Sequence, residues 1–280
     1  MRSAYDVETV RTAERAAMAR GPEGALMQRA AAALAAECAR LLGRVYGSRV
    51  TLLVGSGDNG GDALYAGARL ARRGAGVSAV LLASDRTHPG GLAALLAAGG
   101  RVVDAEGVRA EEAVAGARLV VDGIVGIGGR GGLRERAARL VAAAREATVV
   151  AVDLPSGVAA DTGEVPGEAV RADVTVTFGT YKPGLLVDPG REYAGAVRLV
   201  DIGLELPPGE RALEALQYAD VARLLPVPGG ESDKYRRGVV GVVAGSARYP
   251  GAAVLCVAGA LHGGAGAVRY AGPAADAVIA

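Results

Sequence analysis

The sequence predicts an α/β protein whose main part is a Rossmann-like three-layer α/β/α domain with a mostly parallel sheet. Two observations lead to this fold class. Between residue 49 and about residue 205, compact apolar runs alternate with helix-forming stretches, as in parallel sheets covered by helices on both faces. The first apolar run is followed by a glycine-rich stretch that leads into a helix, which gives a strand-turn-helix unit.

The individual elements follow from periodicity and from glycine and proline breaks. Apolar residues recur every three or four positions up to Leu42, so this segment is predicted to be helical, with a break at Gly21-Pro22. Further helices are predicted at residues 62–73, 92–98 and 134–146, the first of them ended by Gly74. Strands are predicted at residues 50–54, 77–83, 101–103, 118–122, 148–153, 174–178 and 196–202.

The chain is predicted to change character after residue 205, where the first domain, residues 1–205, ends. Residues 206–233 hold proline-rich turn signals around a short helical stretch and are predicted to be a linker. Residues 234–280 predict a strand at 238–244, a helix at 252–263 and a strand at 267–271. One strand-helix-strand unit cannot close a core by itself, so this segment is interpreted as a truncated second domain or as a remnant docked on the first.

The composition is that of a globular protein with a full core. Of 280 residues, 51% are hydrophobic and 22% are charged, which excludes compositional disorder. The net charge of +1 argues against a nucleic-acid partner, because such proteins usually carry a basic excess on one face. Cys38 and Cys256 fit no metal or redox spacing, and both are expected to be buried in apolar helices.

No segment predicts export or membrane insertion. The first 21 residues lack the short apolar core of a signal peptide. No run of about 18 uninterrupted apolar residues occurs. We therefore expect a cytoplasmic protein without a membrane partner.

The glycine-rich stretch Gly55–Asp62 is the first candidate for ligand binding. Its four glycines permit close approach of a ligand to the backbone, and the following helix offers free N–H groups to a phosphate. The pattern is neither G-x-G-x-x-G nor a P-loop, so tight-turn packing explains it equally well. Asp62 has a structural alternative as well, because an aspartate at this place can cap a helix.

Carboxylates at strand ends form the second candidate. Asp122 and Asp153 end two predicted strands, and the carboxyl ends of parallel strands face one common crevice. Asn59, Asp122 and Ser156 offer oxygen ligands only, which suits a hard cation and not zinc. Lys182 either reaches over this crevice or is a solvated loop lysine. His88 and His262 are interpreted as surface or structural residues, and nothing supports a Ser-His-Asp triad.

Several segments together resemble one family. GSGDNGGDALYAGARL is similar to a G-x-G-N-N-G-G-D-G element, and DGIVGIGGRGGL is similar to a D-A-I-F-G-T-G element. Residues 149–204 are similar, nearly end to end, to a block that runs from V-D-I-P-S-G to D-I-G-I. These motifs are those of the NAD(P)H-hydrate epimerase family, and the resemblance covers about residues 8–205.

The resemblance implies epimerisation of the (6R)- and (6S)-NAD(P)H hydrates, NADHX and NADPHX, in nicotinamide nucleotide repair. It implies potassium coordination by Asn59, Asp122 and Ser156, and proton transfer at the C6 hydroxyl by Asp153. The small-molecule substrate would contact Asp58, Asn59, Gly60, Gly61, Asp62, Gly126, Ile127, Gly128, Gly129, Arg130, Gly131, Gly132 and Asp153. We also expect a homo-oligomer.

A second resemblance covers residues 233–273, which are similar to the first strand-helix-strand of the ribokinase-like, ADP/ATP-dependent NAD(P)H-hydrate dehydratases. The nucleotide-binding and catalytic segments of such a domain would lie beyond residue 280. Dehydratase (lyase) activity is therefore expected to be lost or incomplete in this chain. ADP or ATP would be a cofactor only of a complete dehydratase domain.

Three residues depart from the epimerase pattern. Asp58 stands where the family usually has Asn, Ala63 replaces a Gly, and Ile127 replaces the Thr of Gly-Thr-Gly. These departures keep open a non-catalytic dinucleotide-binding scaffold or sensor. An ordinary Rossmann dehydrogenase is disfavoured because its G-x-G-x-x-G fingerprint is missing. A sugar-kinase-like enzyme is disfavoured because too little of that domain is present.

Overall fold

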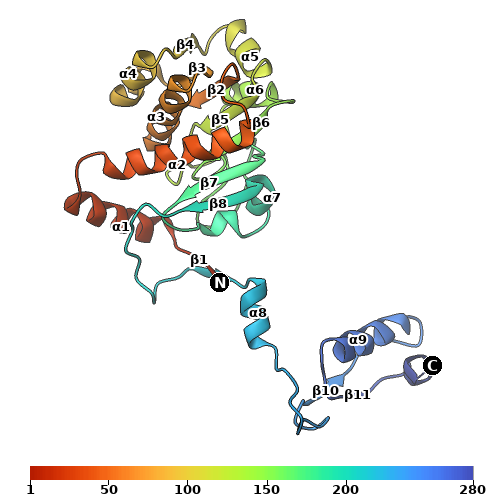
Figure 1. Ribbon diagram of the computed structural model, residues 1–280. Helices are drawn as coiled ribbons and strands as arrows, with labels where there is room; N and C mark the ends of the chain where they lie inside the picture. The colour runs from red at the N-terminus through yellow and green to blue at the C-terminus, as the bar shows by residue number, and fades with distance from the viewer. Residues whose placement is uncertain (280) are drawn as a thin grey trace. The chain divides into compact units, whose positions relative to one another are not determined.

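The computed structural model describes residues 1–279 and divides the chain into two compact units, Met1–Ala215 and Leu216–Ala280 (Figure 1). The segment predicted as a linker, residues 206–233, contains two regular elements, β9 (Leu213–Ala215) and α8 (Tyr218–Leu224). Among residues 1–279, no helix is long and apolar enough to cross a membrane.

A seven-stranded parallel sheet forms the centre of the first unit and confirms the predicted fold class. The strand order is β4-β3-β2-β5-β6-β7-β8, and every neighbouring pair is parallel. The order reverses between β2 and β5, and in open α/β sheets such a switch point is where ligands bind. The strands are β2 (Arg49–Val54), β3 (Gly76–Leu81), β4 (Arg101–Asp104), β5 (Leu119–Gly123), β6 (Thr148–Val152), β7 (Val174–Phe178) and β8 (Ala196–Val200).

Helices cover both faces of this sheet (Figure 1). Neighbouring residues of β2 point to opposite faces: Leu52 and Val54 belong to one core cluster and Leu53 to another. The first cluster includes α2 (Ala25–Leu42) and α3 (Asp58–Arg72), with α4 (Pro89–Ala97) beside them. The second includes α5 (Val108–Ala115) and α6 (Glu135–Ala142).

Shorter elements complete the first unit. Helix α1 (Val7–Arg20) begins at Asp6, whose side chain accepts a hydrogen bond from the Thr9 N–H. Strand β1 (Arg2–Ala4) pairs antiparallel with β9. The remaining elements are the 3₁₀ turns η1 (Ser84–Arg86) and η2 (Pro183–Leu185) and the helix α7 (Gly190–Ala194).

The start of α3 differs from its prediction. This helix begins at Asp58, four residues before the predicted start at 62, and Gly57 is its N-cap. The interpretation of Asp62 as an N-cap is therefore wrong. Glycine usually disfavours helices, but Gly60 is so close to the Gly55 carbonyl oxygen that an added Cβ would lie 2.5 Å from it. Close packing, not local propensity, sets this helix start.

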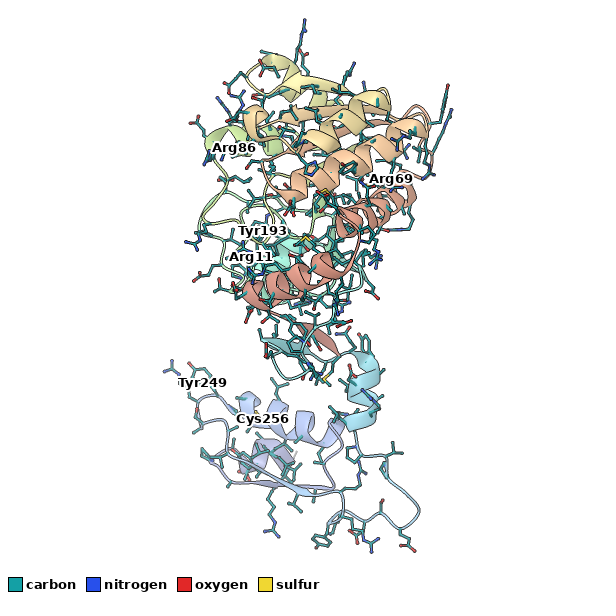
Figure 2. The ribbon with its side chains drawn as sticks, turned by 90° about the vertical axis from the view of Figure 1, so that its left-hand side faces the viewer. Arg11, Arg69, Arg86, Tyr193, Tyr249 and Cys256 are labelled. Carbon is teal, nitrogen blue, oxygen red and sulfur yellow. The ribbon has the colours of Figure 1, made fainter. Side chains whose placement is uncertain are left out.

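The second unit contains the predicted strand-helix-strand. Strands β10 (Val239–Val242) and β11 (Ala267–Tyr270) are parallel, and α9 (Gly251–His262) connects them. The short helix α10 (Ala275–Ile279) follows. Cys256 lies on α9 and is exposed, so the expectation that both cysteines are buried holds only for Cys38 (Figure 2). The reason is that Ala253 is the only buried residue of α9 among the residues described.

Candidate functional site

A cavity of about 1020 Å³ lies where the ends of β2, β5, β6 and β7 meet the N-terminus of α3. Residues of α1 and α2 close it from the other side. Of the substrate-binding residues predicted from the sequence, those that line the cavity are Asp58, Asn59, Asp62, Gly126, Ile127, Gly128 and Asp153. The cavity thus lies at the switch point of the sheet, where such folds bind ligands.

The N-terminus of α3 is held against the ends of β2 and β5 by glycines. A Cβ on Gly55 would lie 1.8 Å from the Ile124 carbonyl oxygen, and one on Gly123 would lie 2.7 Å from the Ala63 Cβ. The family departure Ala63 is therefore accommodated by the glycine opposite it. Gly57 is the N-cap of α3, and no side chain accepts a hydrogen bond from the first N–H groups of the helix. These N–H groups lie at the end of α3 that borders the cavity.

The turn after β5 contributes only its first part to the cavity. Gly126, Ile127 and Gly128 line it, whereas the rest of the predicted binding turn, residues 129–132 with Arg130, does not. A Cβ on Gly126 would lie 2.4 Å from the Asn59 Oδ1, so a larger residue there would displace the Asn59 side chain. Ile127 packs against the buried core cluster that includes Leu154.

Asp153 directly follows β6 and is the only described non-glycine residue with a positive φ, at 66°. This region is costly for an aspartate, and such strain often accompanies a functional site. Its Oδ1 accepts hydrogen bonds from the Thr177 hydroxyl (3.0 Å), the Phe178 N–H (3.2 Å) and the Lys182 ammonium. Within residues 1–279, no donor reaches Oδ2, and Asp153 lines the cavity.

Lys182 was singled out from the sequence, but the structure places it differently from both interpretations. It is only 1% exposed, and its Nζ also donates to the Thr177 hydroxyl (3.1 Å) and the Phe178 carbonyl (3.0 Å). Both sequence interpretations are wrong, because this lysine is neither solvated nor extended over the crevice. It lies behind Asp153 and fixes the carboxylate. The one sequence signal was its position four residues after a strand that ends beside Asp153.

Asp122 and Ser156 form a buried hydrogen-bonded pair below the cavity. The Ser156 hydroxyl donates to the Asp122 Oδ1 (2.7 Å), and the Ser156 N–H donates to Oδ2 (2.8 Å). Burial raises the pKa of Asp122 to about 6, although the hydrogen bonds from Ser156 act in the opposite direction. In the described part of the chain, no lysine or arginine nitrogen lies within 4.0 Å of this carboxylate. Its negative charge therefore has no cationic side chain to balance it.

Asn59 lies next to this pair. Its Nδ2 donates to the Val152 carbonyl (2.6 Å), which directs Oδ1 toward Gly126. The residue before Gly126, Val125, donates its N–H to the Ser156 hydroxyl oxygen (3.0 Å), and its carbonyl oxygen lies 3.1 Å from the same hydroxyl. The three predicted potassium ligands are thus brought to one place, with the Val125 carbonyl beside them.

Further carboxylates surround the cavity. Asp62 is 7% exposed, its Oδ1 is buried without a hydrogen-bond partner among the residues described, and its pKa is raised well above the ordinary value, first by burial and then by Asp153. Burial also raises the pKa of Glu14, with repulsion from Asp153 second. Arg11 projects from α1 beside Gly128, so a positive charge lies at the same opening (Figure 2).

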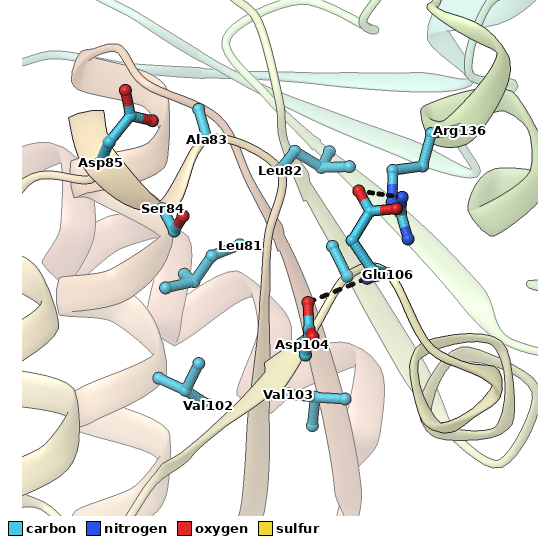
Figure 3. Close-up of a pocket in the computed structure, with 11 residues that line it drawn as sticks. Leu81, Leu82, Ala83, Ser84, Asp85, Val102, Val103, Asp104, Glu106 and Arg136 are labelled. Carbon is cyan, nitrogen blue, oxygen red and sulfur yellow. Dashed lines mark hydrogen bonds and ion pairs between the residues drawn. The ribbon is translucent and has the colours of Figure 1, made fainter.

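A second hollow, of about 440 Å³, lies at the ends of β3 and β4 (Figure 3). Glu106 forms an ion pair with Arg136, and its N–H donates to the Asp104 carboxylate (2.9 Å). None of the binding residues predicted from the sequence lines this hollow. The chemistry-bearing residues therefore gather in the larger cavity.

Comparisons with known sequences converge on one family. Residues 23–184 match the family described as YjeF-related protein N-terminus. The chain is 50% identical over 287 residues to the bifunctional NAD(P)H-hydrate repair enzyme Nnr of Mycobacterium tuberculosis, covering 100% of this chain and 58% of that protein. It is 43% identical over 242 residues to the NAD(P)H-hydrate epimerase of Microbacterium testaceum, covering 84% of this chain and 91% of that protein. The chain therefore spans little more than half the length of the bifunctional relative.

A solved structure agrees with the fold. The crystal structure of the yeast protein ynu0 superposes with a TM-score of 0.61 at 19% sequence identity, over 77% of this chain and 97% of that one. At this identity, the likeness concerns the fold alone.

Proposed function

Because this chain belongs to the family of YjeF-related N-terminal domains and NAD(P)H-hydrate epimerases, we propose that it is an isomerase that interconverts the 6R and 6S forms of NADHX and NADPHX. The observation that carries this proposal is Asp153. Its carboxylate is fixed through one oxygen by three donors and leaves the other oxygen to the cavity. A carboxyl group held in this way is suited to move a proton to and from a bound hydroxyl.

The proposed reaction needs one proton-transfer group. In the hydrate, C6 of the reduced nicotinamide ring carries a hydroxyl next to the ring nitrogen. The C–O bond breaks as the hydroxyl takes a proton and leaves as water, and water returns to the opposite face and gives the proton back. Asp153 is proposed to hold this proton at Oδ2, an effect typically worth about 10²–10⁴-fold in rate. Lys182 and Thr177 position the carboxylate.

The residues below the cavity fit a potassium ion. A buried carboxylate without a cationic partner, a hydroxyl, an amide oxygen and a backbone carbonyl form an all-oxygen set that suits a hard cation. Asn59, Asp122 and Ser156 would hold it, as the family resemblance implies. A bound cation would supply positive charge next to the phosphate-bearing substrate and would favour the ionised form of Asp122.

The non-catalytic scaffold remains the second candidate because of the carboxylates at the cavity. Glu14, Asp58 and Asp62 add negative charge where an anionic dinucleotide would bind. The first N–H groups of α3 and the guanidinium of Arg11 oppose this charge. A turnover measurement separates the two candidates, since a scaffold binds without accelerating the reaction.

The test is a coupled repair assay on mixed NADHX epimers. An independent S-specific dehydratase and its nucleotide are supplied in excess, and recovery of NADH is followed by absorbance. We expect this chain to accelerate recovery of the slow R fraction, and we expect Asp153→Asn to remove the acceleration. Recovery of the R fraction at its spontaneous rate would leave only the scaffold.

Potassium is tested with the same assay. Replacing KCl by tetramethylammonium chloride is expected to slow the epimerase step and to lower the melting temperature of the wild type. Asp122→Asn is expected to abolish the difference between the two salts, because the neutral amide gives the ion no charge to balance. An equal rate and melting temperature of the wild type in both salts would contradict the potassium site.

A further inference from the structure

One end of the cavity lies away from Asp153 and contains groups that the proposed reaction does not use. Met27 on α2, Tyr65 on α3 and His88 at the start of α4 line this end. Helix α3 packs on β2 and β3 and α4 packs on α3, whereas Asp153 follows β6 on the other side of the switch point. A molecule that spans the cavity therefore has two different surroundings at its two ends.

The walls of this second end suit a flat aromatic ring. The rings of Tyr65 and His88 meet edge to face, with centroids 5.7 Å apart and planes at 66°. The Met27 sulfur and the His88 Cδ2 both come within about 3 Å of the place where a Cβ on Gly61 would be, at 3.0 and 3.1 Å. Two aromatic rings and a polarizable thioether form a surface on which a base can stack.

The polar groups at this end supply one donor and one acceptor. The Nδ1 of His88 accepts the Gly91 N–H at 3.0 Å, so the proton of the neutral ring lies on Nε2 and can be donated. Asp62, one turn of α3 before Tyr65, lines the cavity with a carboxyl group that is more than nine-tenths buried, and no described residue donates a hydrogen bond to it. Adenine offers the matching pair on one edge, an acceptor at N7 and an amino donor at N6.

We propose that Met27, Asp62, Tyr65 and His88 form the seat of the adenine ring, with the hydrated nicotinamide at Asp153. This inference rests on the proposed function for the identity of the ligand. In open α/β sheets, a dinucleotide lies across the switch point, so its two bases reach opposite sides of it. The first turn of α3 lies between the two ends and offers its N–H groups to the pyrophosphate.

Calorimetric titration of the full chain with AMP and with IMP tests the seat, because neither ligand carries a nicotinamide. AMP is expected to bind at least about tenfold more tightly than IMP, whose carbonyl replaces the amino donor. Tyr65→Leu, which keeps apolar bulk but removes the π face, is expected to weaken AMP binding about tenfold. His88→Asn keeps an acceptor for the α4 cap, and it is expected to weaken AMP binding similarly. Glu106→Gln, in the second hollow and outside the lining of this cavity, is the control and is expected to leave AMP affinity unchanged.

The outcomes separate the seat from the proposed function. Equal affinities for AMP and IMP, no AMP binding, or AMP binding unchanged by Tyr65→Leu in a protein of wild-type melting temperature would overturn the seat, even if the repair assay shows turnover. AMP affinity that depends on Tyr65 and His88 supports the seat. If the repair assay then shows no acceleration, only the proposed epimerase activity fails.

Discussion

At the scale of single residues, the site depends on buried charges that are fixed by very few partners. Asp153 has one cationic partner, Lys182, and the two side chains are 9% and 1% exposed. Asp122 is held only by hydrogen bonds from Ser156 and the Ile124 N–H. Buried groups of this kind cost stability when one partner is removed, so they can be probed by folding as well as by turnover.

The Lys182–Asp153 pair is expected to dominate the effect of either single substitution. Lys182→Met leaves a buried carboxylate without its cation and is expected to destabilise the protein by about 3–5 kcal/mol. Asp153→Asn leaves the lysine without its anion and is expected to cost a similar amount. Urea unfolding of the double variant is expected to give a loss clearly smaller than the sum of the two. Additive losses would show that the two side chains do not stabilise one another.

Because the Asp62 carboxyl is buried, we expect the stability of the protein to depend on pH. Its pKa in the folded chain is raised from the ordinary 3.8, so the folded state binds the proton more tightly than the unfolded state. The folded state is therefore favoured at low pH, and this contribution is lost as pH rises above 3.8 toward the folded pKa. Asp62→Asn removes the effect. Its melting temperature relative to the wild type is expected to be higher at pH 8 than at pH 5.

Asp58→Asn is the matched control for that measurement. Asp58 belongs to the same helix and lines the same cavity but is exposed, so its replacement is expected to change stability by no more than about 0.5 kcal/mol. A gain at pH 8 that is equal for both variants would mean that general charge reduction, not burial of Asp62, is responsible.

Single residues also mark the limit of the sequence prediction. Asp122 and Asp153 could be found because each ends an apolar strand, and parallel strands bring their carboxyl ends together. Lys182 could not be interpreted correctly, because its burial depends on Thr177, Phe178 and Asp153 converging around one nitrogen. A helix cap was open as an alternative for Asp62, beside substrate binding, because the sequence does not show that the helix starts four residues earlier.

At the scale of elements, the strands were predicted more accurately than the helices. Strand β7 agrees with its predicted residues, and the other strands of the sheet differ by a few residues at their ends. Apolar runs identify buried parallel strands whatever their neighbours are. Helix α5 was not predicted, and α3 was predicted to start too late. Segments rich in alanine and glycine give weak signals of helix propensity. The α3 start is set by contacts between glycines instead.

Two glycines of the same turn differ in how closely they are packed, so their replacement by alanine is expected to differ in its effect on stability. A Cβ on Gly55 would lie 1.8 Å from the Ile124 carbonyl oxygen, so Gly55→Ala is expected to cost at least about 3 kcal/mol or to prevent folding. Gly57, two residues later, has no atom within 4 Å of such a Cβ and a φ of −103°. Gly57→Ala is expected to stay within about 1 kcal/mol of the wild type. Circular dichroism during urea unfolding measures both variants, and similar losses would contradict the packing assigned to Gly55.

At the scale of the whole molecule, the chain holds one unit with a complete core and one with little. The first unit buries both faces of its seven-stranded sheet. In the second unit, β10 and β11 leave valines exposed, Val239 and Val240 at 42% each. The sequence anticipated this contrast because one strand-helix-strand unit cannot bury both faces of a sheet.

Limited proteolysis is expected to distinguish an exposed segment of the second unit from the end of the first unit. Residues 226–238 are exposed and contain no helix or strand, so trypsin is expected to cut first at Lys234, Arg236 or Arg237. Arg211 serves as an internal control. It precedes β9, which pairs with β1, and it forms an ion pair with Glu214 at 3.1 Å. Intact-mass spectrometry at short digestion times identifies the first product. If cleavage at Arg211 comes first, the pairing of β1 with β9 does not hold the end of the first unit in place.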